Sequence, residues 1–148
     1  MMHMHAVVFA NPDFDQEWPA AGSDDDPNNI VWGQDLAAFV VQQLDARGMD
    51  VGEGRMFAGE GGWTVQVRNR GVLCNVFVHW AAFGRPPVDH WVIQVAPRHG
   101  FFASITGRRS HGNMSAYEIA LAIRDEVESL DGSKDVRLVD EDGFRRIY

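Results

Sequence analysis

The sequence predicts an α+β fold, a two-layer sandwich in which two helices cover one face of an antiparallel β-meander of about four to five strands. Apolar residues recur at helical spacing in two segments, 31–47 and 115–130. Between these segments, apolar and polar residues alternate from Trp63 to Ala96, as in strands that bury one face. The turn residues Asn69-Arg70-Gly71 interrupt the alternation, so the strands fold back on one another.

Length and composition fit a single domain over residues 1–148. A chain of 148 residues buries on the order of 70% of the surface that its unfolded form exposes, and nine Phe and five Trp supply bulk for a core. The formal net charge of −8 opposes binding to a phosphate backbone. We therefore expect no nucleic acid as a partner and favour a neutral or basic protein.

Three features predict a cytoplasmic protein without a membrane partner. No stretch approaches the run of about 18 apolar residues that a membrane span needs. Residues 1–5 lack the basic start and the apolar core of a signal peptide. Cys74, the single cysteine, cannot form an internal disulfide and lies in an apolar run, which is typical of a core residue in a reducing compartment.

Residues 1–28 are predicted to form an N-terminal arm and an acidic loop. Ala6–Phe9 is a short apolar run that fits either a first strand or an arm laid against the domain. Asp24–Asp26 resembles the start of a calcium loop, but the alternating oxygen ligands, the central glycine and the distal glutamate are missing. A solvated loop is the preferred interpretation.

The first helix is predicted over Val31–Arg47, with its N-cap at Asn28 or Asn29. Gly48, in the left-handed conformation, should end it. The apolar stripe of this helix faces the core and comprises Trp32, Leu36, Phe39, Val40 and Leu44. A short edge strand is expected within Met49–Phe57.

The register of the following hairpin can be predicted because a shift of one residue would turn every side chain to the wrong face. With Asn69 opposite Val72, apolar residues pair on one face: Val67 with Cys74, Val65 with Val76 and Trp63 with Val78. A third strand, Asp89–Ala96, continues this face if His79 opposes His90. Trp91, Ile93 and Val95 then oppose Val78, Val76 and Cys74.

The C-terminal part is predicted to contain a helix and a strand. Ser115 and Glu118 form a capping box that would open a helix running to about residue 130. A last strand is expected over Asp135–Val139, and an acidic turn over residues 140–143 follows it.

The opposite face of the predicted sheet is the candidate protein-contact surface. Phe77 is expected between Thr64 and Val92, which gives an apolar centre with a polar rim. Six residues are assigned to partner binding: Arg68, Phe77, His79, His90, Val92 and Gln94. The alternatives are that the N-terminal arm or residues 98–105 cover this face, or that it meets water.

The candidates for metal binding and catalysis are weak. His79 and His90 would be cross-strand neighbours, but zinc takes three or four ligands and Cys74 faces the other side. No serine, threonine or cysteine stands in a nucleophile motif with a histidine and an acid in reach. We therefore assign no metal, no cofactor and no catalytic residue, and we expect a non-enzymatic protein.

A locally basic region provides an alternative site. A fourth strand is expected within residues 98–105, and the loop 107–113 leads to the second helix. Free amides at the start of that helix, together with arginine side chains, could hold an anion. The residues assigned to this alternative are Arg98, Arg108, Arg109 and His111. A surface loop whose arginines pair with nearby carboxylates is the competing interpretation.

Part of the sequence resembles a group of known proteins. Trp32-Gly33-Gln34-Asp35-Leu36 through Leu44 and Gly48, followed by Gly61-Gly62-Trp63, is similar to small uncharacterised bacterial proteins, some of them of the immunity type. The similarity covers about a third of the chain and implies a partner-neutralising role. The acidic charge and the element order also resemble secretion chaperones, although about 28 residues precede the first helix here, where such chaperones usually begin with it.

Two functions follow as hypotheses. The first is a non-enzymatic protein-binding domain, an immunity-type or chaperone-like partner of another protein. The alternative is an enzyme or ligand-binding domain for an anionic, phosphorylated small molecule. A homodimer formed through open sheet faces or edges is compatible with the first.

Overall fold

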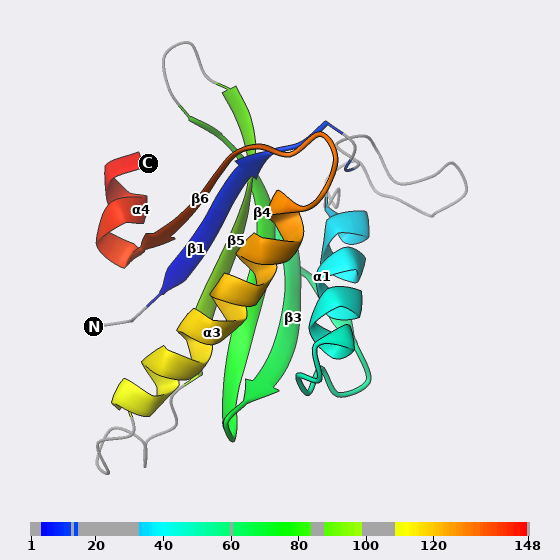
Figure 1. Ribbon diagram of the computed structural model, residues 1–148, viewed down its shortest axis with the longest axis vertical. Helices are drawn as coiled ribbons and strands as arrows, with labels where there is room; N and C mark the ends of the chain where they lie inside the picture. The colour runs from blue at the N-terminus through cyan, green and yellow to red at the C-terminus, as the bar shows by residue number, and fades with distance from the viewer. Residues whose placement is uncertain are drawn as a thin grey trace.

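The computed structural model describes residues 4–12, 14, 33–59, 61–83, 88–98 and 109–147. Within them, a six-stranded antiparallel sheet is accompanied by three helices (Figure 1). The elements follow in the order β1 His5–Ala10, α1 Gln34–Ala46, β2 Met56–Gly59, β3 Gly62–Asn69, β4 Val72–Phe83, β5 Val88–Pro97, α3 Arg109–Glu128, β6 Lys134–Asp140 and α4 Glu141–Ile147. The predicted α+β class is confirmed, with more strands than the four to five expected.

The strand order in the sheet is β2-β3-β4-β5-β1-β6. The N-terminal strand β1 therefore lies inside the sheet and pairs with both β5 and β6. Ala6–Phe9 is fully buried, which explains why this run is continuously apolar rather than alternating. The strand interpretation of this segment is confirmed, and the interpretation as an arm is wrong.

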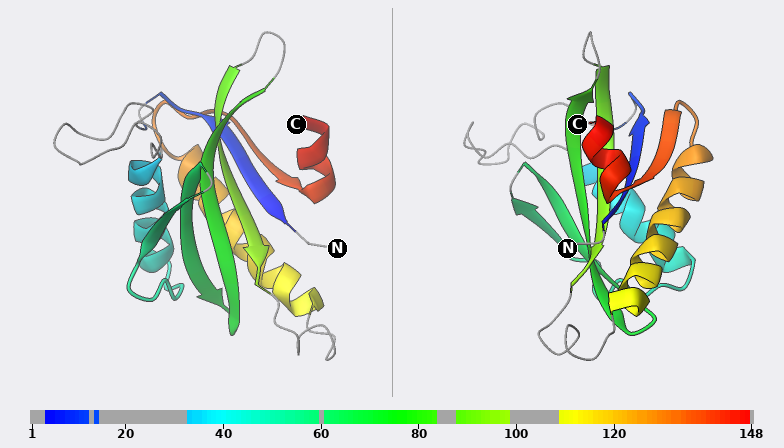
Figure 2. Two further views of the ribbon diagram at one scale, coloured as in Figure 1. Left: turned by 180° about the vertical axis from the view of Figure 1, so that it is seen from behind. Right: turned by 90° about the vertical axis from the view of Figure 1, so that its left-hand side faces the viewer.

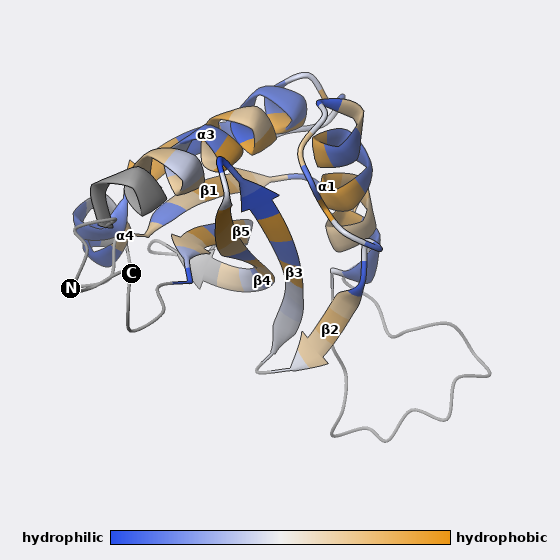
Figure 3. Cartoon of the chain, turned by 90° about the horizontal axis from the view of Figure 1, so that it is seen from below, coloured by the Kyte–Doolittle hydropathy of each residue, from blue (hydrophilic) through white to orange (hydrophobic). Residues whose placement is uncertain are grey.

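Helices α1 and α3 lie side by side on one face of the sheet, as expected (Figures 2 and 3). Between this helical layer and the sheet lies the main core. The largest of its fully buried side chains include Phe9 of β1, Leu36 and Leu44 of α1, Trp91 and Ile93 of β5 and Ile119 of α3. The sandwich is thus held together by apolar burial on this inner face.

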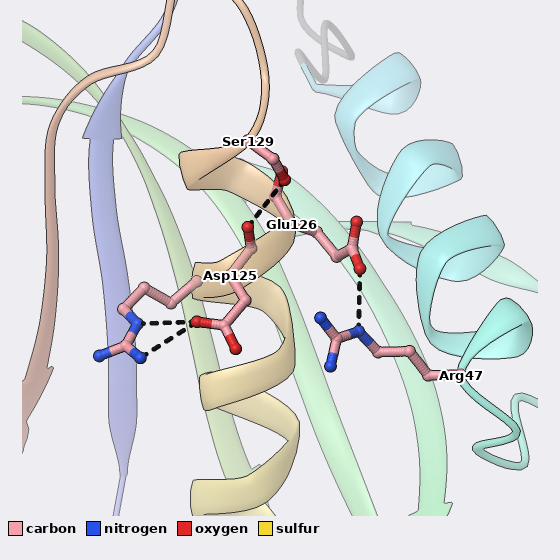
Figure 4. A network of polar contacts seen from close by, with 5 residues as sticks. Arg47, Asp125, Glu126 and Ser129 are labelled. Atoms are coloured by element: carbon pink, nitrogen blue, oxygen red, sulfur yellow. Dashed lines mark hydrogen bonds and ion pairs between the residues drawn. The ribbon is translucent and has the colours of Figure 1, made fainter.

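A polar contact at the surface joins the two helices. Arg47, which follows α1, donates from Nε to Glu126 Oε1 of α3 at 2.9 Å (Figure 4). In the same view, the hydroxyl of Ser129 donates to the main-chain oxygen of Asp125 at 2.9 Å and helps to end α3. Both partners of the ion pair are partly exposed, so its contribution to stability is small.

The hairpin of β3 and β4 has the predicted register. Asn69 opposes Val72, and Val67, Val65 and Trp63 oppose Cys74, Val76 and Val78. The predicted register of the third strand is wrong by two residues, because His79 opposes Val92 and His90 opposes Ala81. A two-residue shift keeps every side chain on its face, so alternation alone cannot detect it.

The first helix begins later than predicted. Gly33 takes the N-cap position with φ 95° and without a side-chain cap, and α1 starts at Gln34. A Cβ at Gly33 would lie 2.9 Å from Trp91 Cζ3, so both the backbone and the close packing require glycine here. The predicted end at Gly48 is confirmed by its φ of 84°. Asn28, Asn29, Val31 and Trp32 lie outside the described residues.

The predicted capping box at Ser115 is wrong. Helix α3 begins at Arg109, so Ser115 lies inside the helix and is fully buried. Its main-chain oxygen accepts a hydrogen bond from Asn69 Nδ2 at 3.2 Å, and Glu118 forms an ion pair with Arg70. These contacts connect the β3–β4 turn to α3 instead of capping a helix.

The C-terminal strand is confirmed as β6, one residue longer at each end than predicted. The acidic turn over residues 140–143 is instead the start of a helix, α4. Asp140 caps it, since its Oδ1 accepts the main-chain N–H of Gly143 at 2.7 Å. Glu141 and Asp142 occupy the first turn, where negative charge is favourable.

The two edges of the sheet differ in character. An edge strand is found, but β2 overlaps the predicted range Met49–Phe57 only at Met56 and Phe57. It contains no charged residue, and Phe57, Ala58 and Gly59 are exposed. Strand β6, at the other edge, carries four charged residues: Lys134, Asp135, Arg137 and Asp140. Charged edges discourage pairing with another chain, whereas an uncharged edge permits it.

Candidate functional site: the outer face of the sheet

The face of the sheet opposite α1 and α3 is covered at one end by α4. Phe144 of α4 is buried against Ala6 and Val8 of β1 and Val92 of β5. Helix α4 contacts chiefly β6 and β1. The part of this outer face formed by β2, β3 and β4 therefore lies beyond the helix.

Two residues assigned to partner binding lie under this cover or beside it. Val92 is fully buried in the cluster around Phe144. His90 is 6% exposed, and its Nε2 lies 3.3 Å from Asp135 Oδ2 of β6. Arg137 also contacts this carboxylate, at 3.3 Å. Val92 and His90 thus serve the packing of the sheet with its C-terminal elements.

The remaining part of the outer face has an aromatic row at its centre. Phe57 of β2 opposes Thr64 of β3, which in turn opposes Phe77 of β4. Phe57 is 51% exposed, and Thr64 and Phe77 are partly buried. We call the following exposed or partly buried side chains of this face the open surface: Phe57, Thr64, Gln66, Arg68, Phe77, His79 and Gln94.

Phe77 is fixed in place by two neighbours on its own face. Its ring stacks on the imidazole of His79 with centroids 4.9 Å apart. It also lies over Gly62, where an added Cβ would meet the ring carbons Cε1 and Cζ at 2.7 Å and the main-chain oxygen of Val78 at 2.4 Å. The absence of a side chain at position 62 leaves the space that the ring fills.

His79 is neutral under ordinary conditions. Burial lowers the pKa of its imidazole to about 4. Its Nε2 lies 3.1 Å from the side-chain nitrogen of Gln94, the residue opposite Phe77. A neutral imidazole can accept a hydrogen bond from this amide, whereas a protonated one cannot. Three assigned residues, Phe77, His79 and Gln94, therefore form one contiguous group.

Arg68, the remaining assigned residue, lines a pocket beside this group. The chain leaves the sheet between Asp50, which pairs with Arg68, and Met56, which pairs with Val65. Between these two pairs, the chain contributes the five residues 51–55, whereas β3 contributes only Gln66 and Val67, so residues 51–55 form a loop. The pocket has a volume of about 480 Å³ and is lined by Asp50, Val51, Gly52, Glu53, Arg55, Phe57, Gln66, Arg68 and Leu73.

The residues of the alternative anion site are only partly described. Arg98 is exposed and extends the ladder, since its N–H donates to the Leu73 oxygen at 2.8 Å. Leu73 opposes Arg68, so Arg68, Leu73 and Arg98 form one row across three strands. Arg109 and His111 lie in α3 rather than in a loop before it. Arg108 and the strand expected over residues 98–105 fall outside the described residues, apart from Arg98.

Within the described parts of the chain, no group of three or more His, Cys, Asp or Glu side chains is arranged to hold a metal ion. The predicted juxtaposition of His79 and His90 is not found, since they face Val92 and Ala81. Cys74 is buried and free, and burial raises the pKa of its thiol to about 11. A thiol of this kind is a poor nucleophile at neutral pH.

No protein-family model, no curated protein and no solved structure matches the chain. Among the described helices, none has the length and apolar character needed to cross a membrane. The resemblance to immunity-type proteins therefore stays a prediction.

Sequence reasoning missed Phe57 and the pocket. The signal for Phe57 was present, because placing Met56 opposite Val65 continues the alternation of the hairpin and puts Phe57 on the same face as Phe77. The pocket had no sufficient signal in the sequence: Gly52 and Gly54, both of which have positive φ in the loop that leaves the sheet, indicate only a turn.

Proposed function

We propose that this chain is a non-enzymatic protein-binding domain that holds its partner against the open surface. The observation that carries the proposal is the row Phe57, Thr64 and Phe77, which places a half-exposed aromatic ring and a partly buried one on the same face, on either side of Thr64. Aromatic anchors surrounded by polar groups are typical of the centre of a protein interface.

The surroundings of this row support the proposal. Gln66, Gln94 and Arg68 provide a polar rim around the aromatic rings. His79 is held neutral by burial, so it adds aromatic ring surface without adding charge. Phe77 is fixed by Gly62 and His79, which lowers the entropy lost when a partner binds.

The partner expected from the sequence is another protein, neutral or basic, which this domain would neutralise or escort in the manner of an immunity protein or a chaperone. The formal net charge of −8 supports a basic partner through long-range attraction. A cytoplasmic setting fits Cys74, which is a buried free thiol. A second copy of the chain is the rival occupant of the same surface.

The test begins with site-specific photo-crosslinking in the native lysate. A photoreactive phenylalanine analogue at position 57 should crosslink one protein partner. The same analogue at Met114, an exposed apolar residue of α3, should not. Equal crosslinking from both positions would argue against the open surface.

The second step measures affinity for the captured partner. Phe57→Asp should weaken binding at least about thirty-fold, as expected for an interface anchor worth about 2 kcal/mol. Met114→Asp is the matched control, and thermal unfolding of both variants checks the fold. Undiminished binding by Phe57→Asp would overturn the proposal. Light scattering of the free chain would reveal the rival homodimer as a doubled mass.

A further inference from the structure

The pocket beside the open surface is formed by the loop 51–55 together with residues of the sheet, and its lining contains both charged and apolar side chains. Five residues, 51–55, stand between the pairs Asp50–Arg68 and Met56–Val65, where β3 contributes only two. The surplus residues turn away from the edge of the sheet at Gly52 and Gly54, which have φ values of 59° and 69°. The pocket is open to solvent, and its volume of about 480 Å³ is within the range of small-molecule sites.

Most of the charged groups in the pocket lining already have partners. Arg55 Nε donates to Glu53 Oε2 at 2.8 Å. Asp50 Oδ1 accepts the main-chain N–H of Gly52 at 2.9 Å. Arg68 differs from them: within the described residues it forms no ion pair with a carboxylate, and the one hydrogen bond that its side chain donates there is long, 3.5 Å from Nη1 to the main-chain oxygen of Gly71. The guanidinium of Arg68 thus has N–H groups that can donate hydrogen bonds to a ligand in the pocket.

Beside the polar residues Asp50, Gln66 and Arg68, the lining also has apolar side chains. Leu73 opposes Arg68 across the β3–β4 pair. Phe57 and Val51 complete the apolar part of the lining, and half of Phe57 is exposed. A ligand that fills this space would place an apolar body against Phe57 and Leu73 and an acceptor against Arg68.

The charges of the lining also select the kind of anion. Asp50 and Glu53 balance Arg55 and Arg68, so the formal charge of the lining is zero. Glu53 and Arg55 already neutralise each other, so a dianion such as a phosphate monoester would gain one guanidinium, that of Arg68, against the one remaining carboxylate, that of Asp50. A single carboxylate matches the guanidinium fork through two parallel hydrogen bonds and carries less charge against the acids.

We propose that this pocket binds an organic monocarboxylate with an apolar body, its carboxylate on Arg68 and its body against Phe57 and Leu73. The carboxylate belongs either to a free small acid or to the C-terminus of a peptide whose last side chain is apolar. This site goes beyond the proposed protein-binding function, and small probes test it without any protein partner.

The first experiment is calorimetric titration of the full chain with phenylacetate, phenylacetamide and phenyl phosphate. Phenylacetate should bind, and phenylacetamide, which lacks the charge, should bind at least about ten-fold more weakly. Equal binding of the acid and the amide would overturn the proposal. Tighter binding of phenyl phosphate than of phenylacetate would overturn the assignment to a monoanion.

Variants locate the carboxylate. Arg68→Gln should reduce phenylacetate affinity at least about ten-fold, and Arg68→Lys, which keeps the charge but not the fork, should fall between it and the native chain. Arg137→Gln changes an exposed arginine of β6, at the far edge of the sheet, and is the matched control. An unchanged affinity in Arg68→Gln would remove Arg68 from the site.

A peptide arm separates the two sources of the carboxylate. N-acetyl-Ala-Ala-Phe with a free C-terminus and the same peptide with a C-terminal amide are titrated in parallel. Tighter binding of the free-acid peptide than of phenylacetate identifies a chain terminus as the ligand. Binding of phenylacetate alone identifies a small acid, and binding of neither contradicts the proposal, while leaving the crosslinking test at position 57 unaffected.

Discussion

The imidazole of His79 stacks on the ring of Phe77, with centroids 4.9 Å apart and planes inclined by 24°. The two residues are separated by one position in β4, so they point to the same face of the sheet. Their contact buries the imidazole and fixes the aromatic ring at the centre of the open surface. A change at either residue should therefore affect the stability of the fold, its pH dependence and the shape of the open surface.

The stability of the fold should depend on pH through His79. Burial lowers the pKa of His79 in the folded state to about 4, whereas an unfolded histidine titrates near 6.5. Below about pH 6.5 the unfolded chain therefore binds the extra proton, and stability is lost as the pH falls toward 4. The slope from this group is at most about 1.4 kcal/mol per pH unit.

Urea unfolding at pH 7 and pH 5 measures this effect. The native chain should lose more unfolding free energy between the two pH values than His79→Phe, which keeps an aromatic ring but does not titrate. Identical losses in the two proteins would show that His79 is not the titrating group.

Gly62 should resist substitution more strongly than Gly59. Both glycines lie in the β2–β3 pair and oppose each other. A Cβ at Gly62 would meet the Val78 oxygen and the Phe77 ring, whereas one at Gly59 meets nothing within 4 Å. Gly62→Ala should cost about 1–3 kcal/mol of unfolding free energy through overpacking, and Gly59→Ala less than about 0.5 kcal/mol. Chemical denaturation of the two variants makes the comparison, and equal costs would contradict the close packing.

The Arg47–Glu126 ion pair should contribute little to stability. Its side chains are 38% and 25% exposed, so water screens the pair. A double-mutant cycle with Arg47→Ala and Glu126→Ala should give a coupling energy of about 0–1 kcal/mol, which decreases with added salt. A coupling well above this range would mean that the contact helps to position α1 against α3.

Cys74 should react with thiol reagents only when the fold opens. It is fully buried on the inner face, and burial raises the pKa of its thiol to about 11. Reaction with a chromogenic disulfide at pH 8 should be slow in the native chain and fast in urea, because the thiolate is the reactive form. Rapid native labelling would contradict the placement of Cys74 in the core.

Alternation was sufficient to predict the β3–β4 hairpin, because Asn69-Arg70-Gly71 fixes the turn and period two fixes the faces. It was insufficient for β5, where a shift of two residues left Trp91 and Ile93 on the correct face but separated His79 from His90. Alternation determines the face on which a side chain lies, so Phe77 was placed on the correct face. Alternation does not determine the register, so the predicted neighbour of Phe77 on β5 was Val92, whereas the structure has Gln94.

The remaining errors arose where tertiary contacts outweigh local signals. Ser115 and Glu118 match a capping box, but α3 begins at Arg109 and Ser115 is buried within it. The pocket could not be predicted from Gly52 and Gly54 alone. It depends on the long-range pair between Asp50 and Arg68, which no local pattern specifies.

The unequal edges of the sheet limit how copies of this chain can join. If two molecules paired through β2, the resulting continuous sheet would end in a β6 strand on both sides. Each of these outer strands carries four charges, which disfavour the addition of a further molecule. Self-association by strand pairing would therefore stop at a closed pair with two-fold symmetry and would not grow into a filament.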